Sequence, residues 1–263
     1  MIGYLGDPRP LGSLVSEPPH SLVRQSWEPR ETRSAKVNAD GWGAGFFLDG
    51  DPEPCLYRST LPIWADVNVP HLGRAVRAGC FVAAVRSATE PTSVSQANTQ
   101  PFASGRIAFL HNGFVERFRE RVRRRLCADL GDDRFGGIAG TSDSEHLFAL
   151  MLDRLDREEP GRPDALARAA AAAVTRVQGW AAEAGASACF SLLLADGDSL
   201  IALRSAVGCD APSLYVRDES GSVVFASERL DDGSGWRAVE EGRILIARRG
   251  APLREERLEG AHL

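Results

Sequence analysis

The chain has 263 residues, of which 43% are hydrophobic and 25% are charged, so it is an ordinary globular protein with enough apolar residues for a sizeable core. The length suits one large layered domain over residues 1–263. The formal net charge of −5 argues against general affinity for nucleic acid or for an anionic membrane, because both reward a basic surface.

The cysteines are odd in number, widely spaced and without a CxxC pair, which disfavours a disulfide framework and a zinc site. They are Cys55, Cys80, Cys127, Cys189 and Cys209. The chain shows no signal-peptide pattern and no apolar stretch long enough to span a membrane. We therefore expect a cytoplasmic protein without a bound metal.

The first part of the chain contains short apolar runs bounded by turn residues, at 45–48, 81–85 and 107–110, and these predict strands. An arginine-rich segment, 117–125, has Phe118 and Val122 four residues apart, which predicts an amphipathic helix with a solvated face rather than a nucleic-acid site.

A helical block follows a stretch, 129–140, that is expected to be a mobile loop. Ser142 and Glu145 have the spacing of a capping box, so a helix should begin there, and the alanine-rich segment 164–183 predicts a second helix beside it.

The last part predicts three strand pairs around glycine-containing turns. Their strands are 187–194 with 199–204, 213–216 with 222–226, and 243–248 with 252–258. Strands, then helices, then strands indicate an α+β fold in layers.

The tripeptide 111–113, His-Asn-Gly, follows an apolar run and presents one side-chain amide beside one glycine N–H. Two such donors can hold an oxyanion. The alternative is a tight turn after a strand, for which Asn-Gly is a frequent choice.

Two charged residues offer partners for a small zwitterion. Arg86 follows an apolar run and could bind a carboxylate bidentately, or it could be an exposed arginine at a strand end. Asp143 lies in the first turn of a predicted helix, where it could receive an ammonium group or only complement the helix dipole. The segment 38–43 is interpreted as a glycine-rich turn into a strand near the site.

Together these segments resemble the class II glutamine amidotransferases. They are 38–43 (Asn-Ala-Asp-Gly-Trp-Gly), 85–89 (Val-Arg-Ser-Ala-Thr), 98–102 (Asn-Thr-Gln-Pro-Phe), 111–113 (His-Asn-Gly) and 141–145 (Thr-Ser-Asp-Ser-Glu). Within that family the chain looks most like the γ-glutamyl amidohydrolases of ergothioneine biosynthesis. The segments similar to that subgroup are 20–26, 37–41, 62–66 and 226–228.

The resemblance implies a four-layer αββα sandwich, the N-terminal-nucleophile hydrolase fold, and cleavage of a γ-glutamyl amide through a cysteine thioester without a cofactor. It assigns Asn112 and the Gly113 N–H to the oxyanion, Arg86 and Thr89 to the glutamyl α-carboxylate, and Asp143 to the α-ammonium. The expected substrate is a small molecule, γ-glutamyl-hercynylcysteine sulfoxide, and no obligate protein partner is expected.

One departure concerns the nucleophile. Family members begin Met-Cys-Arg and lose the methionine, whereas this chain is written Met1-Ile2-Gly3-Tyr4. The family's opening Gly-Tyr-x-Gly matches residues 3–6, so the expected Met-Cys-Arg falls just before Met1 and a misassigned start is our leading hypothesis. An internal cysteine cannot use its own nitrogen as the base, because that nitrogen is an amide. The chain as written should therefore be inactive.

Two other functions stay open on sequence grounds. A non-catalytic protein that binds γ-glutamyl groups or glutamate would keep the same charged residues but form no thioester. A glutaminase subunit would supply ammonia to a separate synthase.

Overall fold

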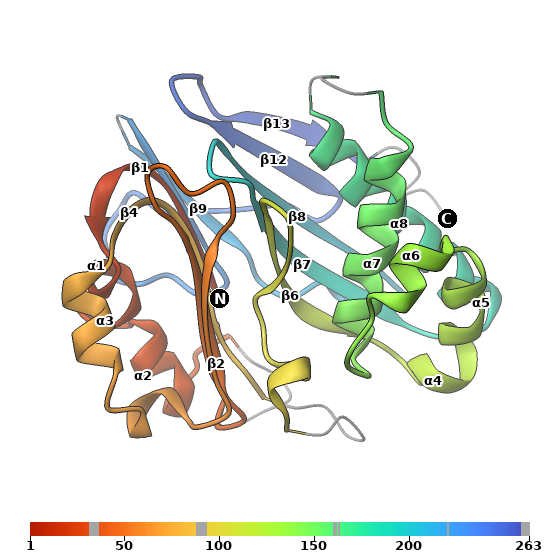
Figure 1. Ribbon diagram of the computed structural model, residues 1–263, viewed down its shortest axis with the longest axis horizontal. Coiled ribbons are helices and arrows are strands. Elements are labelled where there is room, and N and C mark those ends of the chain that lie inside the picture. The colour runs from red at the N-terminus through yellow and green to blue at the C-terminus, as the bar shows by residue number, and fades with distance from the viewer. Residues whose placement is uncertain (32–36, 88–93, 160–161, 163, 220, 259–263) are drawn as a thin grey trace.

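The computed structural model describes residues 1–31, 37–87, 94–159, 162, 164–219 and 221–258. Two antiparallel sheets lie face to face at its centre (Figure 1). The strands predicted at 45–48, 81–85, 107–110, 187–194, 199–204 and 222–226 are all present, with their ends shifted by a few residues.

The first sheet has seven strands. In chain order they are β1 (Ile2–Pro10), β2 (Trp42–Phe47), β3 (Cys55–Ser59), β4 (Arg77–Val85), β9 (Tyr215–Glu219), β10 (Ser222–Ala226) and β11 (Arg237–Ala238). Their order in space is β11-β9-β10-β1-β4-β2-β3, so the N-terminal strand lies in the middle of the sheet. Three helices pack on the outer face, namely α1 (Gly12–Val15), α2 (Leu22–Trp27) and α3 (Val69–Ala75).

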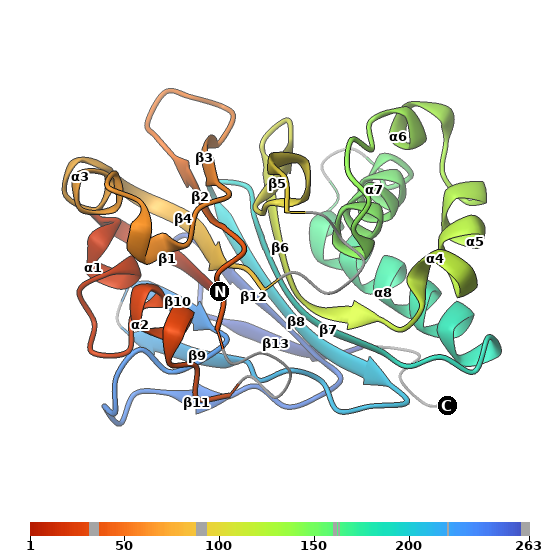
Figure 2. The same ribbon diagram turned by 90° about the horizontal axis from the view of Figure 1, so that it is seen from below.

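The second sheet has six strands. They are β5 (Phe102–Ser104), β6 (Ile107–Val115), β7 (Ala188–Ala195), β8 (Ser199–Val207), β12 (Arg243–Arg248) and β13 (Arg254–Arg257), ordered β13-β12-β8-β7-β6-β5. The two predicted long helices cover its outer face, as α7 (Asp143–Asp156) and α8 (Ala165–Glu183). Figure 2 shows the resulting sequence of layers, helices on either side of the two sheets, which confirms the predicted αββα sandwich.

The alternation of side chains along each strand divides the hydrophobic core into separate clusters on the two faces of the sheets. Leu5 of β1 and Met1 just before the strand lie in the cluster between the sheets, whereas Ile2 and Tyr4 lie in the cluster under α1–α3. On β6, Ala108 and Leu110 join the inter-sheet cluster, and Phe109 joins the cluster under α7 and α8. Because side chains of a strand alternate between faces, these assignments also fix where the polar residues that follow will point.

The strand β1 was not predicted from sequence. Its composition is unfavourable, since Gly3, Gly6, Pro8 and Pro10 all weaken a strand prediction. Pairing with β4 is interrupted between Leu5 and Arg9, where Gly6 and Pro8 lie, and it resumes with Arg9 opposite Ala78 and Pro10 opposite Arg77 at the end of the strand. An added Cβ at Gly3 would lie 3.0 Å from a methyl group of Leu200 in the opposite sheet, so a larger residue there would displace that side chain.

Two segments between β6 and α7 differ from prediction. The single helix expected over 117–125 is two short ones, α4 (Phe118–Arg121) and α5 (Arg123–Ala128), which join at Val122; the two apolar positions are buried as expected. The expected mobile loop at 129–140 contains α6 (Asp132–Gly136). Arg134 holds it to α7 through two bonds of 2.7 Å to the Asp156 carboxylate.

None of the helices in the described ranges is both long and apolar enough to cross a membrane.

Candidate active site

The His111-Asn112-Gly113 segment lies inside β6 rather than in a turn. Its strand continues to Val115, and Asn112 and Gly113 pair with Ser191 and Phe190 of β7. The tight-turn alternative is therefore wrong. The glycine serves a close approach of strands, because a Cβ at Gly113 would lie 2.0 Å from the carbonyl oxygen of Cys189.

The alternation of β6 sends neighbouring residues of this segment to opposite faces. His111 points under α7, where it is buried and its Nδ1 lies 2.9 Å from Ser144 Oγ. Burial lowers the pKa of His111, which favours the neutral imidazole. Asn112 follows Ala108 and Leu110 on the inter-sheet face, and it is exposed where that face opens to solvent. Asn112 is thus accessible to solvent, whereas His111 is packed inside the protein.

Gln100 fixes the backbone of β6 at this position. Its Oε1 accepts from the His111 N–H at 2.6 Å, and its Nε2 donates to the His111 carbonyl at 2.9 Å. Asn98, just before it in the chain, accepts from the Thr141 N–H at 2.8 Å. The 98–102 segment therefore connects β6 with the start of α7.

Asp143 stands at the N-terminus of α7, which Ser142 caps by accepting from the Glu145 N–H. Its Oδ2 accepts from the Val115 N–H at 2.8 Å, and its Oδ1 accepts from the Ser144 N–H at 2.8 Å. The capping box is only half formed, because the Glu145 carboxylate binds the N–H groups of Ala139 and Gly140 instead. Asp143 thus connects the end of β6 to the start of α7.

Arg86 directly follows β4 and is half-buried. Its N–H donates to the Gly41 carbonyl at 2.8 Å, and its carbonyl accepts from the Asp40 N–H at 2.9 Å. Cys80, Val82 and Ala84 of β4 all belong to the inter-sheet cluster, so the two-residue period directs Arg86 to the same face. Burial lowers the pKa of the Arg86 guanidinium, and the nearby Asp40 carboxylate opposes the shift; an arginine stays charged at neutral pH.

Contacts between the sheets show that Arg86 and Asn112 lie at the same end of the sandwich. Along β2, an added Cβ at Gly45 would lie 3.6 Å from Ala108, and one at Gly43 would lie 2.2 Å from the Gln100 carbonyl. The next position on that face is Gly41, whose carbonyl accepts the hydrogen bond from the Arg86 N–H. Gln100 accepts a hydrogen bond from the N–H of His111, the residue before Asn112. The two predicted ligand contacts therefore face the same inter-sheet space.

Thr89 lies outside the described residues. The segment 38–43 is confirmed as a turn into a strand: Gly41 has φ of +115° and Trp42 opens β2. Trp42 is a core residue, 1% exposed, whose Nε1–H donates to Asp66, whereas Trp64 is 43% exposed and packs edge-on against Trp27. Sequence reasoning assigned no role to Gln100, Ser144 or Ser191, although the first two lie in the family-like segments 98–102 and 141–145.

The start of β1 lies beside the same end of the first sheet. Ile2 pairs with Ala83 of β4 and Ala226 of β10, and the Met1 amine is buried and donates to Ser227 Oγ at 2.7 Å. Burial lowers the pKa of that amine to about 5, against the opposing charge of Glu228. Glu228 in turn lies 2.6 Å from His20 in a buried pair.

Three of the five internal cysteines are poorly suited to act as nucleophiles. Burial raises the pKa of Cys80 and of Cys189 to about 12 and also raises the pKa of Cys209. The reactive form of cysteine is the thiolate, which is scarce near neutral pH at such values. Within the described ranges, no three His, Cys, Asp or Glu side chains form a group that could hold a metal ion.

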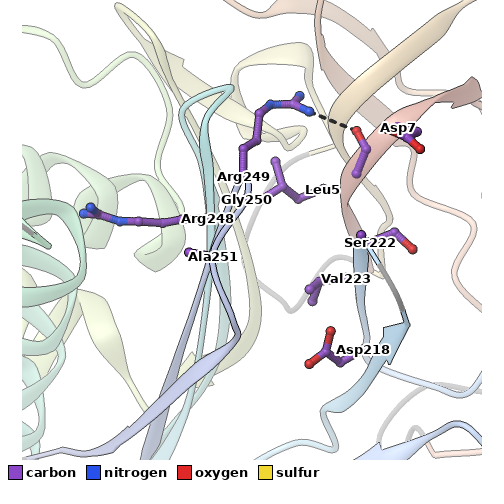
Figure 3. A pocket seen from close by; sticks show the side chains of 11 residues that line it. Leu5, Asp7, Asp218, Ser222, Val223, Arg248, Arg249, Gly250 and Ala251 are labelled. Atoms are coloured by element: carbon purple, nitrogen blue, oxygen red, sulfur yellow. Dashed lines mark hydrogen bonds between the residues drawn. The ribbon is translucent and has the colours of Figure 1, made fainter.

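A surface cavity of about 420 Å³ lies at the other end of β1, between Leu5, Val223 and the β12–β13 turn (Figure 3). Arg249 spans one side of it and donates to the Gly6 carbonyl at 2.9 Å, whereas Arg248 points away. Arg86, Asn112 and Asp143 are not among its lining residues.

Comparison with known proteins adds to this geometry. The family model described as glutamine amidotransferases class-II matches residues 14–211. The chain is 32% identical over 248 residues to the γ-glutamyl-hercynylcysteine sulfoxide hydrolase of Mycolicibacterium smegmatis, covering 94% of each chain. It is 31% identical over 253 residues to the protein of the same name from Mycobacterium tuberculosis, covering 96% of this chain and 94% of that one.

The fold is similar to solved structures as well. A glutamine aminotransferase class-II domain protein from Silicibacter pomeroyi superposes with a TM-score of 0.69 and 24% identity, over 98% of both chains. The glutamine phosphoribosylpyrophosphate amidotransferase of Bacillus subtilis superposes with a TM-score of 0.63, over 98% of this chain and 49% of the other.

Proposed function

The chain belongs to the class II glutamine amidotransferases, a family of amide-hydrolysing enzymes, and we propose that it is a γ-glutamyl amidohydrolase acting on γ-glutamyl-hercynylcysteine sulfoxide. The products are glutamate and hercynylcysteine sulfoxide. The observation that carries the proposal is the convergence of Arg86 and Asn112, from different sheets, on one end of the inter-sheet space.

The glutamyl head of the substrate carries one negative and one positive charge, and the site offers a partner for each. The Arg86 guanidinium pairs with the α-carboxylate in a bidentate, charge-assisted contact that its partial burial strengthens. Asp143 receives the α-ammonium at the N-terminus of α7. Thr89, which follows Arg86 in the chain, is the second proposed contact of the α-carboxylate.

The oxyanion of the tetrahedral intermediate is held by Asn112 Nδ2 and the Gly113 N–H. The bonds from Gln100 to both backbone groups of His111 hold this stretch of β6 rigid, so the Gly113 N–H is oriented before the substrate arrives. Preorganisation of this kind is what makes oxyanion donors effective, since they need not reorient during the reaction.

We place the nucleophile on a cysteine two positions upstream of Met1, as in the family's Met-Cys-Arg opening. Each step back along β1 is one step forward along β4, so continuing the Ile2–Ala83 register puts that position opposite Arg86. The alternation that turns Met1 and Leu5 to the inter-sheet face turns it there too. A cysteine at this position would lie beside the glutamyl site.

In this scheme the α-amine of the cysteine takes the thiol proton, and the thiolate attacks the γ-carbonyl carbon. Collapse of the tetrahedral intermediate breaks the C–N bond, and the proton goes to the departing amine. Water then hydrolyses the thioester to free glutamate. A free α-amine, with a pKa of about 7.7–8.0, suits this proton transfer near neutral pH.

The test compares a form that carries Met-Cys-Arg upstream with a form that starts at Met1. Each form is incubated with γ-glutamyl-hercynylcysteine sulfoxide and, in a separate reaction, with glutamine as the alternative substrate. We expect equal amounts of glutamate and hercynylcysteine sulfoxide from the first form only, and a variant with alanine for the upstream cysteine should bind substrate without turnover.

Glutamate binding without product from the cysteine form would contradict the proposal and support a non-catalytic binding protein. Release of ammonia from glutamine, in preference to cleavage of the sulfoxide substrate, would support the glutaminase function. N-terminal sequencing of the protein from its natural source decides directly whether Cys-Arg precedes Met1.

A further inference from the structure

Ser191, in the middle of β7, carries a buried hydroxyl that has no partner among the described residues. Its side chain is 0% exposed, and its Oγ makes no hydrogen bond to any described residue. A hydroxyl removed from water in this way is costly to leave unpaired, so such groups are rare and mark places where a partner is expected to arrive.

The position of Ser191 points to that partner. Ser191 is directly opposite Asn112 in the β6–β7 ladder. Its side chain faces the inter-sheet space, because Leu193 and Ala195 on the same strand belong to the inter-sheet cluster at two-residue intervals. Residues directly opposite on one face have Cβ atoms about 4.5–5.5 Å apart, within reach of a hydroxyl and an amide.

The other neighbour of Ser191 in the ladder is already engaged. Arg204 of β8 is opposite Ser191, and its guanidinium donates to the carbonyls of Pro212, Ala211 and Val239 at 2.8, 2.9 and 3.0 Å. Arg204 therefore has its own acceptors. Of the two residues opposite Ser191 in the sheet, Asn112 on β6 is the one left to accept from the Ser191 hydroxyl.

We propose that Ser191 is a positioning residue for the oxyanion site, whose Oγ–H donates to Oδ1 of Asn112 when the site is occupied. The inference rests on the proposed function, since it assumes that Asn112 contacts the oxyanion. An asparagine amide can present either its oxygen or its NH₂ group, and only the NH₂ group stabilises negative charge. A donor that holds Oδ1 removes the wrong orientation and leaves Nδ2–H directed at the substrate.

Kinetics of the cysteine-containing enzyme test this role. In Ser191→Ala, kcat should fall about tenfold with KM unchanged, a smaller loss than removal of Asn112 itself at roughly 10²–10³. In an Asn112→Ala background, Ser191→Ala should lower kcat no further, because it acts only through Asn112. An unchanged kcat in Ser191→Ala, or the same tenfold loss in both backgrounds, would overturn the proposal.

Ser205 provides a matched control. It is a serine of β8 that is 1% exposed, but it faces α8 and accepts from Gln178 Nε2 at 2.8 Å. Ser205→Ala removes a satisfied buried hydroxyl next to the same strand, so it should lower thermal stability and leave kcat and KM unchanged. A kcat loss equal to that of Ser191→Ala would show a general packing effect instead.

A second readout does not depend on activity. The side-chain amide resonances of Asn112, identified by their loss in Asn112→Ala, should shift in Ser191→Ala and stay unchanged in Ser205→Ala when glutamate is bound. If no form hydrolyses γ-glutamyl amides, the proposed function fails, and this spectrum decides the Ser191–Asn112 contact alone. Identical Asn112 resonances in wild type and Ser191→Ala would overturn it.

Discussion

Asp143 Oδ2 accepts a hydrogen bond of 2.8 Å from the N–H of Val115, the last residue of the strand that carries Asn112. The carboxylate proposed to bind the substrate ammonium is therefore also a structural link between β6 and α7. Substitution at this position has two separable consequences, one for the fold and one for binding.

Asp143→Asn should change both the stability of the fold and the binding of substrate. An amide has one acceptor where the carboxylate serves two N–H groups, so unfolding free energy should fall by about 1–2 kcal/mol. KM for the γ-glutamyl substrate should rise roughly tenfold or more, since a charge-assisted contact is lost. Glu145→Gln is the control, because Glu145 also binds two N–H groups at this helix end; it should lower stability and leave KM unchanged. Equal KM values for both variants would remove Asp143 from the substrate site.

Asn112→Ala and Gly113→Ala should separate catalysis from folding at adjacent positions. Asn112 is exposed, so its truncation should leave the melting temperature unchanged while kcat falls roughly 10²–10³-fold. A Cβ at Gly113 would lie 2.0 Å from the Cys189 carbonyl, so Gly113→Ala should lower both stability and activity. Thermal denaturation and steady-state kinetics on the cysteine-containing enzyme give the comparison. Near-normal kcat in Asn112→Ala would refute its oxyanion role.

Arg86→Lys should raise KM about tenfold with little change in kcat. The charge is retained, but an ammonium cannot reproduce the bidentate geometry of a guanidinium on a carboxylate. Arg77→Lys, at the opposite end of the same strand, is the matched control and should leave KM as it is. Isothermal titration with glutamate would report the same difference without turnover. Unchanged affinity in Arg86→Lys would mean that Arg86 is an ordinary arginine at a strand end and does not bind the substrate.

Stability should fall as the pH is lowered from about 7 toward 5, because two buried histidines are held neutral. Burial lowers the pKa of both His111 and His146 in the folded protein. The unfolded chain, with a histidine pKa of ~6.5, then binds more protons than the folded one, so unfolding becomes easier as pH falls through that value. Each group contributes at most about 1.4 kcal/mol per pH unit.

His146 allows the sign of that pH effect to be checked. Its Nδ1–H donates to the Ser142 carbonyl at 2.7 Å, and its Nε2 accepts from Arg123 Nε at 3.2 Å, so a second proton would break the arginine contact. In His146→Asn the amide can replace the Nδ1–H donor but does not titrate. Urea unfolding between pH 7.5 and 5 should therefore show a shallower slope than wild type; an identical slope would show that His146 is not a source of it.

Much of the architecture could be predicted from sequence because the signals are local. Short apolar runs bounded by turn residues marked β4 and β7, and the capping-box spacing of Ser142 and Glu145 marked the start of α7. The end of β6 could not be placed in this way, because Asn112 and Gly113 have the residue types of a turn. What keeps them in a strand is the approach of Cys189, which is 76 positions further along the chain than Gly113.

The candidate site also combines residues that local sequence can identify with contacts that it cannot. Arg86, Asn112 and Asp143 could be proposed from the sequence because each belongs to a recognisable segment. The supporting contacts could not, since the bond between Gln100 and His111 and the pairing of Ser191 with Asn112 depend on how separate strands come together. Secondary-structure patterns carry no information about such pairings until the register of the sheets is known.

Because Arg86 directly follows a strand of one sheet and Asn112 lies in a strand of the other, a glutamyl ligand that contacts both would act as a noncovalent cross-link across the sandwich. Such a ligand binds the folded chain alone and adds RT ln(1 + [L]/Kd) to its stability, about 2.7 kcal/mol at a hundredfold excess over Kd. Hydrogen exchange should then slow together in β4 and β6, although the two strands share no ladder. The supply of substrate would thereby affect how much of the time the protein stays folded, as well as how fast it hydrolyses substrate.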